Sequence, residues 1–286
     1  YGPAAELTLF SGLFILLLAP EFFQPLRSWA QAYHDRAAAL GAADSMALLQ
    51  SEAASHESAA HPRLSTEQER AAHNGRIRIA DLALEYPGRG RVLTGINLEI
   101  PRGQVVALVG PSGSGKSSLL HCLAGFVTPD AGSLSLFGQA PGQAPLAWLG
   151  QRPFLIHGSW ADNLRLTAPQ ADTPAMLRAI DAVGLAGLLA TQAQGLETPL
   201  GEGGRGLSGG QAQRLALARV WLSDAELVLL DEPTASLDEH SEAEVIEALR
   251  GLVSSGKTLI IATHHPALMA LAERRIELAK GSLADV

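Results

Sequence analysis

The stretch Gly110 to Ser117, GPSGSGKS, decides the fold of this chain. It matches the pattern G-x-x-x-x-G-K-S without a gap, follows the apolar run VVALV, and opens an expected helix at Ser117–Ala124. Gly110, Gly113 and Gly115 allow a tight loop whose backbone N–H groups can point at phosphate oxygens. The positive end of the helix dipole adds to this attraction. The sequence therefore predicts a phosphate-binding loop, whereas a chance glycine-rich loop would lack these flanks.

Two side chains of this loop have the chemistry that a triphosphate and its metal ion need. We expect Lys116 to contact the β- and γ-phosphates, and the Ser117 hydroxyl to bind Mg²⁺. The neighbouring Ser112, Ser114 and Ser118 belong to the same predicted nucleotide-binding loop. The cofactors predicted from the motif are ATP and Mg²⁺.

A second motif, Leu227 to Pro233 (LVLLDEP), ends a buried strand in two acidic residues. The carboxyl ends of parallel strands are where doubly wound sheets bind ligands. Asp231 is the expected Mg²⁺ contact, through water, because Mg²⁺ loses its hydration shell reluctantly. Glu232 is the expected general base for an attacking water. If only one of the two motifs were present, two solvated acids at a strand end would be a reasonable alternative. The two motifs together predict ATP hydrolysis.

The third motif is Leu207 to Gln211, LSGGQ. Ser208 is suited to cap the following helix, and Gly209 and Gly210 leave its first amides accessible. With Gln211, these residues form a second predicted anion-binding helix end. A purely structural cap is the alternative.

Short β-branched or leucine-rich runs alternate with helical segments in the larger part of the chain. The expected strands are Ile77–Glu85, Gln104–Val109, Leu227–Leu230, Thr258–Ala262 and Arg275–Leu278, and the expected helices are Ser117–Ala124, Pro174–Val183, Gly210–Trp221 and Ser241–Val253. Apolar strands followed by helices predict an α/β fold of the P-loop NTPase class, with a mostly parallel sheet covered by helices on both faces.

Composition limits the function classes further. Of the 286 residues, 47% are hydrophobic and 17% are charged, which predicts a folded core rather than disorder. The net charge of −8 argues against a nucleic-acid partner, because nucleic-acid binding usually needs a basic face. Cys122 is the single cysteine and lies on the apolar face of an expected helix, so we interpret it as a buried core thiol.

The N-terminal part has a different composition. Leu7 to Ala19 is uncharged and almost wholly apolar, but it is shorter than the roughly 20 residues that cross a bilayer. The chain also begins without methionine, so we expect this run to be the end of a membrane helix, with a buried helix as the alternative. The expected organisation is the end of a transmembrane domain (1–50), a polar linker (51–74) and the ATPase domain (75–286).

From Asn74 to the end, about three quarters of the chain, the sequence resembles the nucleotide-binding domain of ABC transporters. The resemblance rests on the three motifs and implies an ATPase with a helical subdomain. It also implies a dimer in which each ATP lies between the glycine loop of one subunit and the LSGGQ of the other. Lys116, Gln151 and His264 then join Glu232 in the catalytic set.

The same resemblance assigns roles to residues outside the three motifs. Tyr86 matches the aromatic residue that stacks on adenine. Gln151, in LGQRP, matches the glutamine that reaches the Mg²⁺ and the attacking water. The loop Ser236 to Asp238 matches the segment that crosses to the partner subunit. His264 matches the histidine that contacts the γ-phosphate, and the adjacent His265 is the weaker alternative.

The N-terminal segments LAPEFFQPLR (18–27) and GAADS (41–45) are similar to the last membrane helix and its extension in the CydDC family of heterodimeric exporters. This resemblance implies a CydC-like partner, contact with the lipid bilayer, and a bacterial inner-membrane location with the ATPase in the cytoplasm. It further implies export of cysteine or glutathione, or of haem, for cytochrome bd assembly. A soluble ABC ATPase, an exporter of another cargo and a non-catalytic nucleotide sensor are the alternatives.

Overall fold

The computed structural model describes residues 75–88, 90–235 and 237–284, together with six helical residues nearer the start, Leu13, Phe14, Leu17, Leu18, Phe22 and Gln24. The chain divides into two units, residues 1–60 and 61–286. The predicted membrane run 7–19, its extension and the linker 51–74 otherwise lie outside the described residues. Among the residues that are described, no helix combines the length and the apolar character needed to cross a bilayer.

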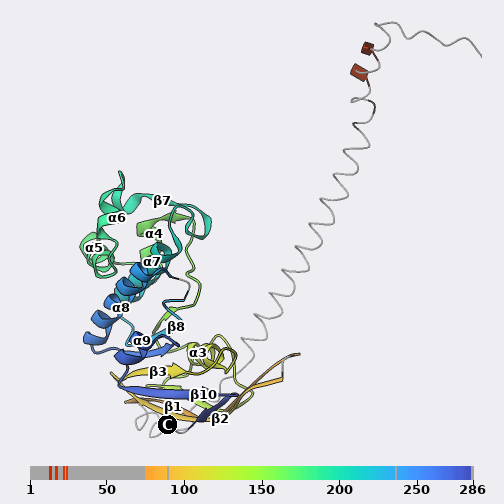
Figure 1. Ribbon diagram of the computed structural model, residues 1–286, viewed down its shortest axis with the longest axis vertical. Helices are drawn as coiled ribbons and strands as arrows, with labels where there is room; N and C mark the ends of the chain where they lie inside the picture. The colour runs from red at the N-terminus through yellow and green to blue at the C-terminus, as the bar shows by residue number, and fades with distance from the viewer. Residues whose placement is uncertain are drawn as a thin grey trace, which may run out of the picture. The chain divides into compact units, whose positions relative to one another are not determined.

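A six-stranded sheet forms the centre of the second unit (Figure 1). In spatial order its strands are β11 (Ser282–Ala284), β10 (Arg274–Ala279), β3 (Val105–Val109), β9 (Thr258–Ala262), β8 (Leu227–Asp231) and β5 (Leu146–Leu149). The strands from β10 to β5 run parallel, and the edge strand β11 is antiparallel to β10. This confirms the predicted mostly parallel sheet.

Both faces of this sheet are buried, because successive side chains of its strands enter different cores. Val106, Leu108 and Ile260 pack in the core that contains α3 (Lys116–Ala124). Leu259 and Ile261 enter the opposite core, which contains α7 (Gly209–Leu222) and α8 (Glu239–Ser254). The short apolar runs of the sequence are therefore fully buried parallel strands.

A second, antiparallel sheet packs against the core that contains α3. Its order is β2 (Gly90–Pro101), β1 (Arg76–Tyr86) and β4 (Ala131–Leu136). The strand expected at Ile77–Glu85 is β1 and lies in this sheet rather than in the parallel one. Its side chains alternate between buried and exposed, as in a strand with one face on the core and one in water.

The remaining helices are α4 (Trp160–Arg165), α5 (Thr173–Ala182), α6 (Ala186–Ala190) and α9 (Pro266–Leu271), with the short turns η1 (Gly195–Glu197) and η2 (Glu202–Gly204) and the pair β6 (Gly158–Ser159) and β7 (Pro199–Leu200). Helices α4, α5, α6 and α7 gather at the end of the unit that is remote from β1 and β2 (Figure 1). This is the predicted helical subdomain. Helices α3, α5, α7 and α8 begin and end within two residues of the predicted bounds.

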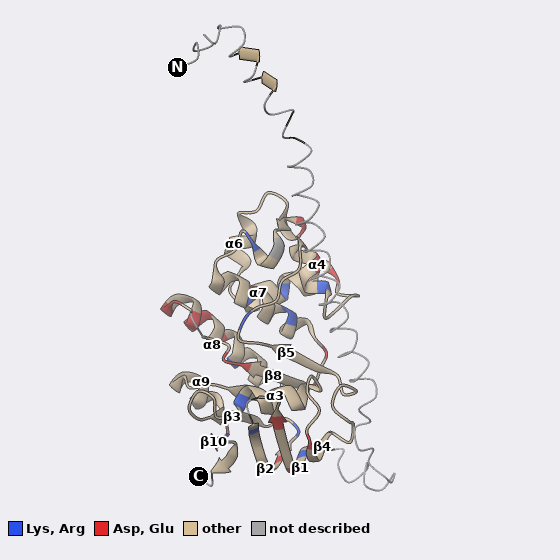
Figure 2. Ribbon diagram, turned by 90° about the vertical axis from the view of Figure 1, so that its right-hand side faces the viewer, with Lys and Arg blue, Asp and Glu red and all other residues tan. Residues whose placement is uncertain are grey.

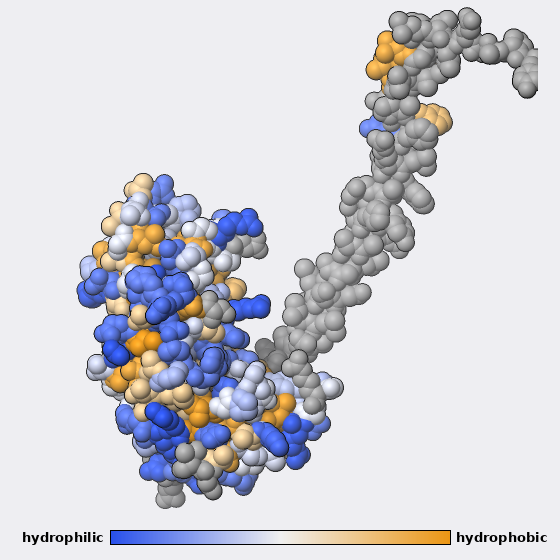
Figure 3. All heavy atoms as spheres, in the orientation of Figure 1, coloured by the Kyte–Doolittle hydropathy of each residue, from blue (hydrophilic) through white to orange (hydrophobic). Residues whose placement is uncertain are grey.

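The surface of the second unit is mainly polar. Hydrophilic side chains cover most of the visible face, with small hydrophobic patches between them (Figure 3). Acidic residues gather on α8, which carries Glu239, Glu242, Glu244 and Glu247, while lysine and arginine are scattered over several elements (Figure 2). Binding of the predicted anionic nucleotide would therefore depend on single cations placed close to it.

Candidate nucleotide-binding site

The predicted phosphate-binding loop connects the buried strand β3 to α3. At Gly110, φ is +146°, and a Cβ atom built there would lie 2.1 Å from the carbonyl oxygen of Leu278 on β10. Glycine tolerates this approach because it has no side chain, so the loop lies tightly against β10. The Lys116 ammonium donates to the carbonyl oxygens of Gly110 (2.8 Å) and Pro111 (3.2 Å), which folds this side chain back over the loop.

Helix α3 begins differently from α4, α5, α7 and α8. Those four helices have side-chain caps, supplied by Ser159, Asp172, Ser208 and Asp238. Helix α3 begins after Gly115, which has no side chain to accept a hydrogen bond from the first amides. These amides and the positive dipole end therefore remain available to an external anion, as the sequence predicts.

Asp231, at the end of β8, is buried with 6% of its surface exposed. Burial raises the pKa of this carboxyl above its ordinary value, and a hydrogen bond from the Ser117 side chain acts in the opposite direction. Its Oδ1 atom is buried without a hydrogen-bond partner among the described residues. An oxygen-seeking divalent cation would satisfy this atom and offset the cost of burying the charge, so Asp231 and Ser117 fit the predicted Mg²⁺.

Glu232 and His264 lie side by side because β8 and β9 are neighbours, with Asp231 paired to Ala262. The backbone of Glu232 has a φ of +48° and is held by a hydrogen bond from its N–H to the carbonyl oxygen of Ala262 (2.9 Å). Its Oε2 atom is 2.9 Å from Nδ1 of His264. A left-handed conformation is strained for a residue with a long side chain, and such strain is typical of functional sites.

His265 points elsewhere. Its Nε2 atom is 2.7 Å from Oε1 of Glu242 on α8, and both side chains are about a quarter exposed. His264 is largely exposed and contacts Glu232, as described above. His264 lines the cleft and His265 does not, and the role of His264 at the γ-phosphate stays a prediction.

An open cleft of about 980 Å³ brings most of the predicted residues together, and this volume is in the range of small-molecule sites. Its lining includes Tyr86, Gly110, Ser112, Gly113, Gly115, Lys116, Ser117, Ser118, Gln151, Glu232 and His264. Ser114 is buried, and Asp231 is adjacent in sequence to the cleft residue Glu232. Residues from five separate parts of the chain thus meet around one space.

Four residues outside the motifs and roles predicted from the sequence also line the cleft: Arg91, Val92, Lys280 and Gly281. The first two belong to β2, and the other two form the turn between β10 and β11. Neither β2 nor β11 was expected from the sequence. The Lys280–Gly281 pair between two apolar runs was the available signal for that turn.

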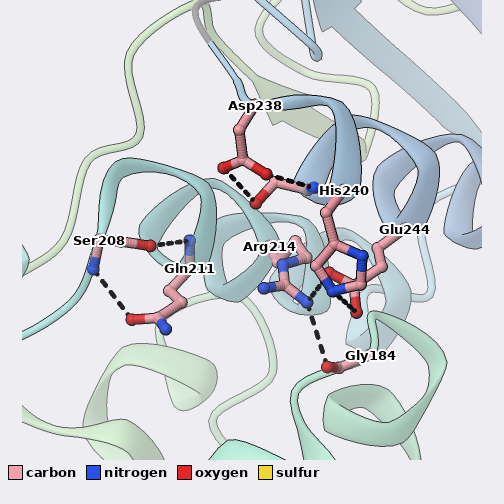
Figure 4. A network of polar contacts seen from close by, with 8 residues as sticks. Gly184, Ser208, Gln211, Arg214, Asp238, His240 and Glu244 are labelled. Carbon is pink, nitrogen blue, oxygen red and sulfur yellow. Dashed lines mark hydrogen bonds and ion pairs between the residues drawn. The ribbon is translucent and has the colours of Figure 1, made fainter.

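The LSGGQ residues lie at the start of α7. The Ser208 hydroxyl accepts a hydrogen bond from the Gln211 amide (3.2 Å), and the Gln211 side-chain oxygen accepts one from the Ser208 amide (2.9 Å) (Figure 4). Asp238 accepts from the amide and the hydroxyl of Ser241 (both 2.9 Å) at the start of α8. Within the described residues, Ser208, Gly209, Gly210, Gln211 and Asp238 do not line the cleft. Their role at a partner's nucleotide stays a prediction, and Ser236 lies outside the described residues.

A polar network holds α7 against α8 (Figure 4). Arg214 on α7 forms an ion pair with Glu244 on α8 and donates to the carbonyl oxygen of Gly184 (3.1 Å). His240 Nε2 is 3.7 Å from Glu244 Oε1. Because only 8% of the Arg214 side chain is exposed, breaking this ion pair would leave a buried charge. The starts of α7 and α8, with Ser208 and Asp238, are therefore held in one arrangement.

Comparison with known proteins supports the fold described above. Residues 93–235, half of the chain, match the ABC transporter family. A solved bacterial Atm1-family ABC exporter with ATP bound superposes with a TM-score of 0.69 at 27% sequence identity, covering 79% of this chain and 40% of that one. The predicted ABC ATPase fold is confirmed.

Two curated bacterial proteins extend the similarity. The glutathione/L-cysteine transport system ATP-binding/permease protein CydD of Escherichia coli (strain K12) is 40% identical over 265 residues, which are 90% of this chain and 44% of that protein. The ATP-dependent lipid A-core flippase of Neisseria meningitidis is 38% identical over 219 residues, 74% of this chain and 35% of that protein. The chain thus spans less than half the length of these two relatives. The phosphate loop, the acidic strand end and LSGGQ all lie within the residues that match the family model. The chain therefore belongs to the ABC transporter family.

Proposed function

We propose that this chain is the ATP-hydrolysing part of an ABC exporter. The observation that carries the proposal is the 2.9 Å contact between Glu232 and His264 in the cleft that the phosphate loop also lines. A paired carboxylate and imidazole beside a phosphate site can move a proton, and a binding-only module does not need them.

In the proposed complex each part of ATP has its own group of residues. Tyr86 stacks on the adenine ring, which is uncharged and planar. The amides of the loop and of the α3 N-terminus bind the phosphates, and Lys116 leaves its two carbonyl partners to reach the β- and γ-phosphates. Ser117, Asp231 and Gln151 hold Mg²⁺, which when bound neutralises phosphate charge and orients the γ-phosphoryl group.

Hydrolysis then proceeds by in-line attack of water on the γ-phosphorus. Glu232 accepts a proton from this water as the new P–O bond forms. The bond between the γ-phosphorus and the β–γ bridging oxygen breaks, and ADP and inorganic phosphate leave. His264 keeps the Glu232 carboxylate oriented through the contact at Nδ1 and lies close enough to the cleft to bind the γ-phosphate.

A second subunit completes the proposed site. Ser208, Gly209, Gly210 and Gln211 of each chain contact the nucleotide held by the other chain, and Asp238 crosses the same interface. Closing the dimer on ATP and opening it after hydrolysis drives the attached membrane helices between two states. The firm packing of α7 against α8 supports this role, because it holds Ser208 and Asp238 as one contact surface.

The transporter type that we favour is CydD-like, with a CydC-like partner, in a bacterial inner membrane. The 40% identity to CydD, a glutathione/L-cysteine transport protein, supports cysteine or glutathione as cargo, with haem as the alternative. The similarity to the lipid A-core flippase keeps another cargo as the competing case. Residues 1–50 are then the end of the transmembrane domain, and 51–74 the linker to the ATPase.

Hydrolysis is tested by measuring ATP turnover and ATP affinity of the Glu232→Gln variant in the presence of Mg²⁺. Loss of the base should lower turnover by about 10²- to 10⁴-fold, while ATP affinity measured by calorimetry stays within about twofold. Glu247→Gln is the matched control, because Glu247 is an exposed carboxylate on α8 paired with Arg250. Near-normal hydrolysis by Glu232→Gln would remove Glu232 from the role of base.

The cargo is tested with the parent transporter and its partner reconstituted in lipid. Cysteine or glutathione should stimulate ATP hydrolysis and accumulate on the far side of the membrane, and haem or lipid A should do neither. Stimulation by lipid A alone would overturn the thiol assignment. Recovery of the full parent protein in the cytosol without detergent would favour a soluble ABC ATPase instead.

A further inference from the structure

We propose that Lys280, at the tip of the hairpin formed by β10 and β11, is a further nucleotide-binding residue whose ammonium group binds the phosphate chain of ATP. The inference rests on the proposed function and assigns a residue that none of the sequence motifs contains.

The conformation of the turn is unfavourable for lysine. Ala279 pairs with Ser282, so Lys280 and Gly281 form a two-residue turn with φ values of +48° and +79°. Turns with two left-handed residues favour asparagine, aspartate or glycine at both central positions, because other side chains are strained there. Residues that break such a local rule are typical of functional sites.

Contacts of Gly281 hold this turn against the phosphate loop. The Gly281 amide donates to the carbonyl oxygen of Ser114 (3.2 Å), and the Gly281 carbonyl oxygen accepts from the Thr94 amide on β2 (2.8 Å). A Cβ atom built on Gly281 would lie 2.3 Å from the carbonyl oxygen of Val92. The backbone of the turn is therefore packed between β2 and the loop, and Lys280 begins beside the phosphate-binding end of the cleft.

The Lys280 side chain makes no competing interaction with the part of the chain that the structure describes. It is exposed and lines the cleft together with Lys116 and Tyr86. Within residues 75–88, 90–235 and 237–284, its ammonium forms no ion pair or hydrogen bond. Lys116, by contrast, already donates to two loop carbonyls. A lysine ammonium is a compact charge on a flexible stem, which suits a phosphate better than the uncharged adenine ring.

The experiment compares ATP binding to the full chain and to its Lys280→Asn, Lys280→Glu and Lys280→Arg variants by calorimetry with Mg²⁺. Asparagine tolerates the left-handed turn, so Lys280→Asn removes the charge without straining the hairpin. We expect Lys280→Asn to raise the ATP Kd by about threefold to tenfold, Lys280→Glu to raise it further, and Lys280→Arg to leave it within about twofold. Raising the salt from about 50 mM to about 500 mM should shrink the difference between wild type and Lys280→Asn, because salt screens exposed charges.

Arg178→Asn is the matched control. Arg178 is an exposed cation on α5 that does not line the cleft, so its loss changes the net charge equally and should leave the ATP Kd unchanged. An unchanged Kd in both Lys280→Asn and Lys280→Glu would overturn the inference, as would a salt-independent loss. Failure of the wild-type chain to bind ATP would refute the proposed function instead, so the two failures are distinguishable.

Discussion

Tyr86 is partly buried at the end of β1 and lines the cleft. Its aromatic ring is the predicted contact for adenine. The ring offers stacking area without a charge, whereas the loop offers charge and amide donors. Affinity and chemistry should therefore depend on different residues.

The first residue-scale prediction is that Tyr86→Ala raises the ATP Kd by about fivefold to a hundredfold, because base stacking on an aromatic ring contributes about 1–3 kcal/mol. Tyr86→Phe should retain the affinity, since the ring is kept. Turnover at saturating ATP should change little in either variant. Calorimetry and steady-state ATPase assays provide the readout, and an unchanged Kd in Tyr86→Ala would show that the ring does not stack on adenine.

Cys122 gives a second prediction at this scale. The thiol is buried on α3, and burial, followed by the charge of Asp130, raises its pKa to about 12. At pH 8 a group with this pKa is ionised in only about one molecule in ten thousand, and the thiolate is the reactive form. Iodoacetamide should therefore label the native chain very slowly at pH 8 and label the denatured chain rapidly. Mass spectrometry measures the extent of labelling, and rapid labelling of Cys122 in the native chain would contradict its buried position.

At the scale of elements, α4 and α7 begin with the same device. Ser159 and Asp162 form a capping box at α4, as Ser208 and Gln211 do at α7. Each box satisfies two backbone donors that a helix start leaves open. The two helices differ in the proposed function, since only the α7 start belongs to LSGGQ.

Substitutions of the two capping serines, Ser159 and Ser208, test stability and function separately. Ser159→Ala and Ser208→Ala should each lower the free energy of unfolding by about 1 kcal/mol, as measured by urea denaturation. Only Ser208→Ala should also lower ATP hydrolysis in the complete dimer, because the proposed function places Ser208 against the partner's nucleotide. If Ser159→Ala reduced hydrolysis as much as Ser208→Ala, the effect would be structural and the LSGGQ assignment would lose its support.

At the scale of the whole molecule, the parallel sheet links the site to both cores. Strands β3, β8 and β9 lead into the phosphate loop, Glu232 and His264, respectively. The same strands supply side chains to both hydrophobic cores. Ligand bound at the strand ends should therefore stabilise the folded domain as a unit.

We predict that ATP with Mg²⁺ at about 100 times its Kd stabilises the second unit by about 2.7 kcal/mol. For domains of this size, that corresponds to a rise in Tm of roughly 5–10 °C. Differential scanning calorimetry measures the shift, and Lys116→Ala should remove most of it at the same ATP concentration. An equal shift in Lys116→Ala would place the stabilising nucleotide outside this site.

Much of the architecture was predictable from local patterns. The bounds predicted for β9 agree with the structure, and four helices agree within two residues, because their periodicity and caps are encoded in adjacent residues. Strand β2 was not predicted. Its pairing with β1 contains three register shifts, which break the strict alternation by which a half-buried strand is recognised.

The sequence by itself determined the chemistry of this protein, namely a phosphate loop, an acidic strand end and LSGGQ, because each motif consists of neighbours in the chain. The tertiary structure decided which of these groups meet. Glu232 contacts His264 because β8 lies beside β9, and Lys280 reaches the cleft because the last hairpin packs on Ser114 and β2. Such pairs depend on strand order and on long-range packing, which a local pattern of residues does not contain.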